Sequence, residues 1–145
     1  MNIEKGLERG VLYIVATPIG NNDDMSSRAK EILIACDRVA AEDTRRTARL
    51  LAKLGGNRHK LISLHEHNED KLVDYVVGEL VKGASVALVS DSGTPLLSDP
   101  GYRLVKAASS SGISVRPIPG PSSIIAALSV CPLPAHPFCF VGFLP

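Results

Sequence analysis

The chain has 145 residues, enough for one domain but not for two, since a chain of this size buries about two thirds of its unfolded surface on folding. Its residues are 45% hydrophobic and 21% charged, which is ordinary for a globular protein. The formal net charge of +1 excludes a positive electrostatic potential over the whole surface, so any contact with nucleic acid requires a local patch of basic residues.

Short apolar, β-branched runs alternate along the chain with segments whose apolar residues recur at spacings of three and four. In chain order we expect a strand at 11–16, a helix at 26–35, a strand at 39–41, a helix at 44–54, a strand at 61–64, a helix at 68–81, a strand at 86–89, a helix at 102–109, a strand at 113–118 and a helix at 122–130. This alternation is typical of βαβ units.

Capping residues support these boundaries. Serine and aspartate stand where three of the helices begin, at Ser26, Asp43 and Ser122. Glycine stands where three helices end, at Gly55, Gly83 and Gly112.

The fold class follows from the strand pattern. Residues 84–90 are small or apolar almost without interruption, as expected of a central strand covered on both faces. We therefore predict an α/β fold with a mostly parallel five-stranded sheet and helices on both faces, in one domain over 1–145 whose ordered core is 11–145. The apolar run at 138–144 predicts the N-terminal domain of a longer protein, whose C-terminal domain is absent from the chain; the alternative is a natural terminal strand.

The cysteines and the apolar stretches exclude some protein classes. Cys36, Cys131 and Cys139 are odd in number and lack C-x-x-C spacing, so neither a disulfide framework nor a zinc knuckle is expected, and we predict buried thiols. The first ten residues lack the apolar segment of a signal peptide, and no run reaches the roughly 18 apolar residues of a membrane span. We expect a cytoplasmic protein.

Three loops at the expected carboxyl ends of strands combine glycine, proline and hydroxyl residues: 16–21 (ATPIGN), 91–95 (DSGTP) and 117–123 (PIPGPSS). Ligands of open α/β sheets bind at this edge, and such loops offer amide and hydroxyl donors to polar groups. Neither G-x-G-x-x-G nor a Walker A motif is present, which argues against nucleotide hydrolysis. Glu42 and Asp43 close the second strand about 20 residues after the first loop, where Rossmann-type domains place a ribose-binding acid.

Seven short segments of the sequence resemble the motifs of a known protein family. They are YIVATPIGN (13–21), AAEDTR (40–45), HEHN (65–68), SDSGTP (90–95), SDPG (98–101), PIPGPS (117–122) and GFLP (142–145). In order and spacing they resemble the tetrapyrrole methylase superfamily, in particular a branch that methylates the ribose 2′-hydroxyl of a cytidine in small-subunit ribosomal RNA.

The resemblance implies a homodimeric, two-domain methyltransferase with S-adenosylmethionine in the cleft between its domains, so this chain alone is expected to be inactive. By motif position, the residues that contact the cofactor are Ile19, Gly20, Ser92, Gly93, Thr94, Leu97, Ser122 and Ser123. The chain departs from the pattern at Asn22, Ser92 and Leu96, where the branch usually has leucine, a small residue and glycine. If the loop needs a positive φ at this position, leucine strains the backbone there. If glycine is used only to leave space, the Leu96 side chain narrows the pocket.

Basic and histidine side chains are the candidates for RNA contact. Arg45, Arg49 and Lys53 fall at i, i+4 and i+8 of one helix with Arg46 adjacent, so this stripe is either a phosphate-binding face or a solvated one. His65 and His67 share one face of a strand, but no third metal ligand with suitable spacing appears and no metal is expected. The alternatives for this pair are a strand-to-helix corner capped by Asn68 and a contact of His65 with RNA.

Ribose methylation also requires that the hydroxyl lose its proton. The carboxylates beside the loops are Glu42, Asp43, Asp91 and Asp99. Asp91 is our candidate proton acceptor, and its alternative role is to cap a turn.

Two other hypotheses compete with RNA methylation. One is methylation of a small tetrapyrrole, against which the segments at 40–45 and 65–68 argue. The other is a non-catalytic dimerisation or RNA-docking module that has lost its cofactor, for which Leu96 is the best support.

Overall fold

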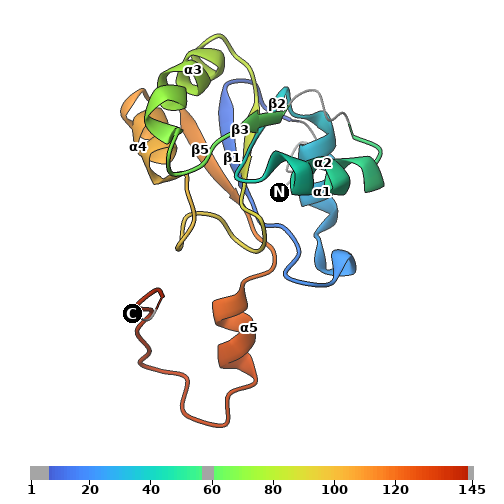
Figure 1. Ribbon diagram of the computed structural model, residues 1–145, viewed down its shortest axis with the longest axis vertical. Helices are drawn as coiled ribbons and strands as arrows, with labels where there is room; N and C mark the ends of the chain where they lie inside the picture. The colour runs from blue at the N-terminus through green and yellow to red at the C-terminus, as the bar shows by residue number, and fades with distance from the viewer. Residues whose placement is uncertain (1–6, 57–60, 144–145) are drawn as a thin grey trace, which may run out of the picture.

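The computed structural model describes residues 7–56 and 61–143, where strands and helices alternate as expected (Figure 1). The strands are β1 (Val11–Val15), β2 (Arg38–Ala41), β3 (Leu61–Ser63), β4 (Val86–Val89) and β5 (Ser114–Ile118). The helices are α1 (Ser27–Ala35), α2 (Thr44–Lys53), α3 (Glu69–Val81), α4 (Tyr102–Ser110) and α5 (Ser123–Ser129), with a 3-10 helix, η1 (Asn22–Asp24), before α1. Each expected element is present, with ends shifted by at most a residue or two.

The sheet has the order β3-β2-β4-β1-β5, and its described pairs are all parallel, which confirms the α/β prediction. β4 and β1 lie at the centre, where their residues are buried on both faces. β5 is an edge strand with Pro117 in it, as the missing amide of proline requires. Because all strands run the same way, the loops after β1, β2, β4 and β5 meet at one edge.

Two hydrophobic cores lie on opposite faces of the sheet. Alternate residues of β1 serve each face: Val11, Tyr13 and Val15 pack with α1 and α2. Leu12 and Ile14 pack with α3 and α4 on the other face. Figure 1 shows these helix pairs on either side of the strands.

The predicted capping residues lie at the helix ends, but one of them makes no capping hydrogen bond. The Ser26 hydroxyl accepts the amide of Ala29, and the Asp43 carboxylate accepts the amide of Arg45 at 2.8 Å, so both cap a helix. Gly55, Gly83 and Gly112 all have positive φ after helix ends. Ser122 occupies the N-cap position of α5 but makes no capping hydrogen bond with its side chain.

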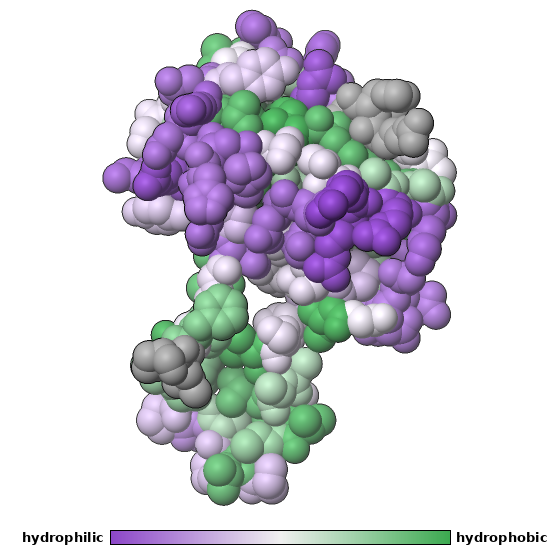
Figure 2. Space-filling view, viewed as in Figure 1, coloured by the Kyte–Doolittle hydropathy of each residue, from purple (hydrophilic) through white to green (hydrophobic). Residues whose placement is uncertain are grey.

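α5 and the segment after it stand away from the sheet (Figure 1). α5 has no buried residue, and Figure 2 shows apolar surface over this part of the chain. Leu133 and Phe143 are among its exposed apolar residues. The prediction of buried cysteines holds for Cys36 but is wrong for Cys131 and Cys139, because both lie on this exposed segment. Among the described residues, no helix combines the length and apolar character needed to cross a membrane.

A hydrogen-bonded clamp joins the starts of β2 and β4. The Asp37 carboxylate accepts the amide and the hydroxyl of buried Ser85 at 2.8 and 2.7 Å. These donors favour the charged carboxylate, so the Ser85 amide, followed by the Ser85 hydroxyl, lowers the pKa of Asp37.

We expect Asp37→Asn to lose more stability at neutral pH than in acid. A lowered folded-state pKa stabilises the fold above the unfolded-state pKa of about 3.9, and this contribution is lost as the pH falls through the folded value. Urea unfolding at several pH values should therefore show the difference between the two proteins shrinking below about pH 4. Asp23→Asn, an exposed carboxylate in η1, is the control; a constant difference for Asp37→Asn would contradict the role of its charge.

Candidate functional site

Two cavities lie at the carboxyl edge of the sheet, and the loops after β1 and β4 form the wall between them. The backbones of Thr17 and Gly93 exchange hydrogen bonds of 2.9 and 3.0 Å across this wall. Gly93 has a φ of +79°, and a Cβ there would lie 3.3 Å from the Cγ2 atom of Ile19. The wall therefore depends on glycine at this position.

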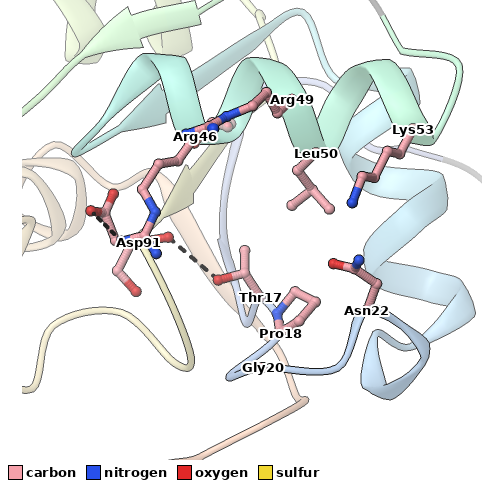
Figure 3. A pocket seen from close by; sticks show the side chains of 11 residues that line it. Thr17, Pro18, Gly20, Asn22, Arg46, Arg49, Leu50, Lys53 and Asp91 are labelled. Atoms are coloured by element: carbon pink, nitrogen blue, oxygen red, sulfur yellow. Dashed lines mark hydrogen bonds and ion pairs between the residues drawn. The ribbon is translucent and has the colours of Figure 1, made fainter.

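The first cavity, which we call the basic pocket, has a volume of about 390 Å³. Arg46, Arg49 and Lys53 line it from α2, Asn22 from the loop after β1, and Asp91 from the loop after β4. Figure 3 shows Lys53 reaching from α2 toward the loop that carries Asn22.

The helical repeat decides which cations face this pocket. Arg46, Arg49 and Lys53 are spaced i, i+3 and i+7, on one face of α2, and all three line the cavity. Arg45 does not line it: its guanidinium turns back to Asp43, 3.1 Å from Nη2 to Oδ2, and this bond holds the pKa of Asp43 at about 2. Arg46, rather than Arg45, therefore joins Arg49 and Lys53 at this cavity, and a contact of Arg45 with RNA stays a prediction.

Asp91 ties the loop after β4 to the beginning of α2. Its Oδ1 accepts the backbone amide of Asp43 at 3.1 Å. Its Oδ2 forms an ion pair with Nη1 of Arg46, also at 3.1 Å. Both oxygens are thus engaged, and Asp91 is the carboxylate that the basic pocket presents alongside its three cations.

Two further carboxylates lie near Asp91. Partial burial, followed by the charges of Asp91 and Asp99, raises the pKa of Glu42. Partial burial also raises the pKa of Asp99, and the charge of Asp91 adds to the effect. The surroundings of Glu42 and Asp99 therefore favour the protonated form of these two carboxyl groups, in contrast to Asp43.

The second cavity, which we call the loop pocket, has a volume of about 290 Å³. It brings together six of the eight residues expected to contact the cofactor: Ser92, Gly93, Thr94, Leu97, Ser122 and Ser123. Ile19 lies against Gly93 in the wall, whereas Gly20 lines the basic pocket on the other side.

Six residues that line the loop pocket were not among those expected to contact the cofactor. Ser98, Asp99 and Ile124 line it, and so do Phe140, Gly142 and Phe143, which fold back after α5. The apolar run at 138–144 was the available signal, although it indicated no ligand site; Leu144, like the Pro145 that closes the GFLP segment, lies outside the described residues.

The lining of the loop pocket fits a nucleoside-like cofactor. The Thr94 hydroxyl donates to the Pro121 carbonyl at 3.0 Å, which joins the loops after β4 and β5. Exposed hydroxyls of serine lie beside apolar Leu97 and Phe143, and this mixture suits ribose and carboxylate groups together with a planar base. The volume lies just below the roughly 300–1,000 Å³ of small-molecule sites, as expected of one side of a cleft.

Leu96 does adopt the costly conformation, with a φ of 88°. Its side chain is half-buried against the core beneath α4, and it does not line the loop pocket. Leucine at this position therefore strains the loop but leaves the pocket open, which weakens the argument for a module that has lost its cofactor.

His65 and His67 lie in the turn after β3, beyond the strand in which they were expected to share a face. The Asn68 side chain accepts the His65 amide at 2.9 Å and donates to the Ser63 carbonyl, so it supports the corner rather than capping α3. His65 lines neither pocket. Within residues 7–56 and 61–143, no group of three candidate ligands is placed to hold a metal ion.

Comparison with known families and proteins gives consistent matches. The family described as Tetrapyrrole (Corrin/Porphyrin) Methylases matches residues 11–139. A protein of Xylella fastidiosa (strain Temecula1 / ATCC 700964) named ribosomal RNA small subunit methyltransferase I is 57% identical over 94% of this chain and 50% of its own length. The protein of the same name from Escherichia coli O157:H7 is 51% identical over 94% of this chain and 48% of its own length. The chain thus spans about half the length of these relatives.

Among solved structures, a uroporphyrin-III-C-methyltransferase from Thermus thermophilus superposes with a TM-score of 0.63. It covers 87% of this chain and 53% of its own, at 23% identity, so the likeness concerns the fold alone.

Proposed function

Since the chain belongs to the tetrapyrrole methylase family, we propose that it is the N-terminal domain of an S-adenosylmethionine-dependent methyltransferase that modifies small-subunit ribosomal RNA at the ribose 2′-hydroxyl of a cytidine. The observation that carries the proposal is identity of 51 to 57% over 94% of the chain to proteins named for that substrate class. The activity is that of a protein about twice this length, so we expect the chain alone to be inactive. A cytoplasmic location and a homodimer belong to the same proposal.

We assign the cofactor to the loop pocket and its wall. Ser92, Thr94, Ser122 and Ser123 would bind its polar groups, Leu97 and Ile19 would contact its apolar parts, and Gly93 would let the loop after β4 approach it. Gly20, which lines the other side of the wall, would let the loop after β1 turn behind the cofactor. When bound, S-adenosylmethionine supplies a methyl group already activated on sulfonium, so the protein contributes mainly position and a path for the proton.

For the substrate, we propose that Arg45, Arg46, Arg49 and His65 contact RNA and that Asp91 accepts the proton of the ribose hydroxyl. Two of these arginines line the basic pocket with Asp91, whereas Arg45 and His65 lie outside it and would contact a strand that extends beyond the cavity. The adjacent residue, Ser92, lines the loop pocket, which places Asp91 at the boundary between the two cavities.

The direct test is transfer of labelled methyl groups from S-adenosylmethionine by this chain and by a version extended to the length of its relatives. We expect the extended protein to methylate assembled small ribosomal subunits and not a porphyrinogen. Methylation of the porphyrinogen alone would establish the tetrapyrrole alternative, and activity on neither would support the docking module.

We expect Leu97→Ala to weaken S-adenosylmethionine binding by about tenfold in the extended protein, because burying a leucine side chain against a ligand is worth about 1.5–3 kcal/mol. Leu97 is 58% exposed, so its truncation should leave the fold intact. Leu133→Ala, at a 70% exposed site outside both pockets, is the control. Calorimetric titration measures both, and equal affinities for the two variants would contradict the assignment.

Self-association is expected from the apolar surface of α5 and the segment after it, where Val130 is 81% and Phe143 is 88% exposed. Light scattering after gel filtration should show a mass that rises with protein concentration. A monomer at all concentrations would count against the dimer.

A further inference from the structure

The basic pocket contains positive charge that the fold itself does not use. Among the described residues, neither the Arg49 guanidinium nor the Lys53 ammonium has an ion-pair or hydrogen-bond partner. Arg46 is paired, but only with Asp91. Three cations and one carboxylate leave an excess of two positive charges around one cavity.

We propose that the basic pocket binds a phosphodiester of a single RNA strand, with Arg49 and Lys53 as its anchors and Arg46 as a third contact released from Asp91. The choice of RNA rests on the proposed function; the anion site rests on the pocket alone. A guanidinium and an ammonium on one helix face provide a planar fork and a point charge, and both bind phosphate oxygens.

The surroundings distinguish this site from a solvated helix face. Buried Thr47 and Leu51 anchor the backbone of α2, and Thr47 itself lines the pocket, so the helix from which the three cations extend is held in place beside the cavity. Leu50 and Pro18 add apolar surface inside the cavity, and the Asn22 side chain faces it from the other side (Figure 3). Because the loop after β4 separates this cavity from the loop pocket, a strand held here lies against the wall of the cofactor site.

The ion pair between Arg46 and Asp91 couples phosphate binding to Asp91. A phosphate competes for the Arg46 guanidinium, which is 56% exposed and free to turn. When Arg46 turns, Oδ2 of Asp91 becomes available while Oδ1 stays bound to the Asp43 amide. Asp91 thus gains a free oxygen only when the strand is in place.

The anchors are tested by fluorescence anisotropy with a short labelled single-stranded RNA and no cofactor, over a range of salt concentrations. Arg49→Gln and Lys53→Gln should each lower the slope of log affinity against log salt by about 0.7 and the affinity by roughly five- to tenfold. Lys106→Gln, an exposed lysine of α4, changes the charge equally and should do neither. Equal effects for all three variants would overturn the site.

The coupling is tested by a double-mutant cycle. Asp91→Asn keeps an oxygen for the Asp43 amide but releases Arg46, so RNA affinity should rise by about fivefold. Asp70→Asn, which removes an exposed carboxylate on α3, is the control for the loss of one negative charge. When Arg46→Gln is already present, Asp91→Asn should raise RNA affinity no more than Asp70→Asn does. A gain that persists without Arg46 would overturn the coupling.

These outcomes are separable from those of the proposed function. If the anchor variants lose RNA affinity but the extended protein transfers no methyl group, the phosphate site is supported and the proposed methyltransferase activity is contradicted. If the extended protein transfers methyl groups but both anchor variants keep their RNA affinity, the methyltransferase activity is supported and the phosphate site is contradicted.

Discussion

Replacing Gly101 with alanine is expected to lower the free energy of unfolding by about 3 kcal/mol. Gly101 is buried at the start of α4 with a φ of +120°, a conformation that side chains rarely adopt. A Cβ there would lie 2.5 Å from Cδ2 of Leu88 and 3.0 Å from Cδ2 of Leu96. Leu88 is 1% exposed in the central strand, so it cannot move aside without disturbing the core.

Gly112→Ala separates the two causes of this loss. Gly112 also has a positive φ, +72°, but a Cβ there would meet no atom within 4 Å. We expect a cost of about 1 kcal/mol, from backbone strain alone. Urea unfolding followed by circular dichroism measures both variants, and equal losses would show that the close approach of Gly101 to Leu88 has no energetic effect.

The regular part of the fold could be predicted because its signals are local. The apolar run of β4, the repeat of α3 and the caps Ser26 and Asp43 each lie within a few residues of the structure that they specify. The meeting of the loops at one edge followed from parallel strands alone. The residues of the loop pocket came instead from the resemblance, since spacing does not distinguish a ligand loop from a turn.

Arg45 shows what the sequence could not decide. Spacing allows Arg45 or Arg46 to join Arg49 on one face of α2, and both follow Asp43 closely. The choice depends on the two carboxylates, because Asp43 takes Arg45 while Asp91, distant in sequence, takes Arg46. Asp91 and Arg46 are 45 positions apart, so the helical repeat of α2 cannot predict their interaction.

The exposed cysteines have a different cause. The segments around Cys131 and Cys139 are apolar, so burial was the natural expectation. In the structure α5 leaves the sheet, and apolar character there indicates a surface rather than a core. Composition cannot distinguish residues that pack within a domain from residues that remain outside it.

Glu69→Ala is expected to lower the free energy of unfolding by about 2 kcal/mol. Glu69 lies in the first turn of α3, is 6% exposed, and its Oε1 accepts the backbone amide of Leu104 at 3.1 Å. Leu104 is in the first turn of α4, whose N-cap is Gly101 and has no side chain to bind that amide. The carboxylate of one helix therefore caps another, and its loss leaves a buried donor without an acceptor.

Glu69→Gln and Asp70→Ala identify the source of this stability. Glutamine keeps an oxygen for the Leu104 amide and loses only the attraction between the charge and the helix dipole, so we expect a cost of about 1 kcal/mol. Asp70→Ala removes the neighbouring carboxylate and its exposed ion pair with Arg103, which is worth at most about 1 kcal/mol. If urea unfolding shows Glu69→Ala to be as mild as Asp70→Ala, α4 is not held by this cap. The packing of α3 against α4 would then have to position the loop between β4 and α4, and with it the loop pocket.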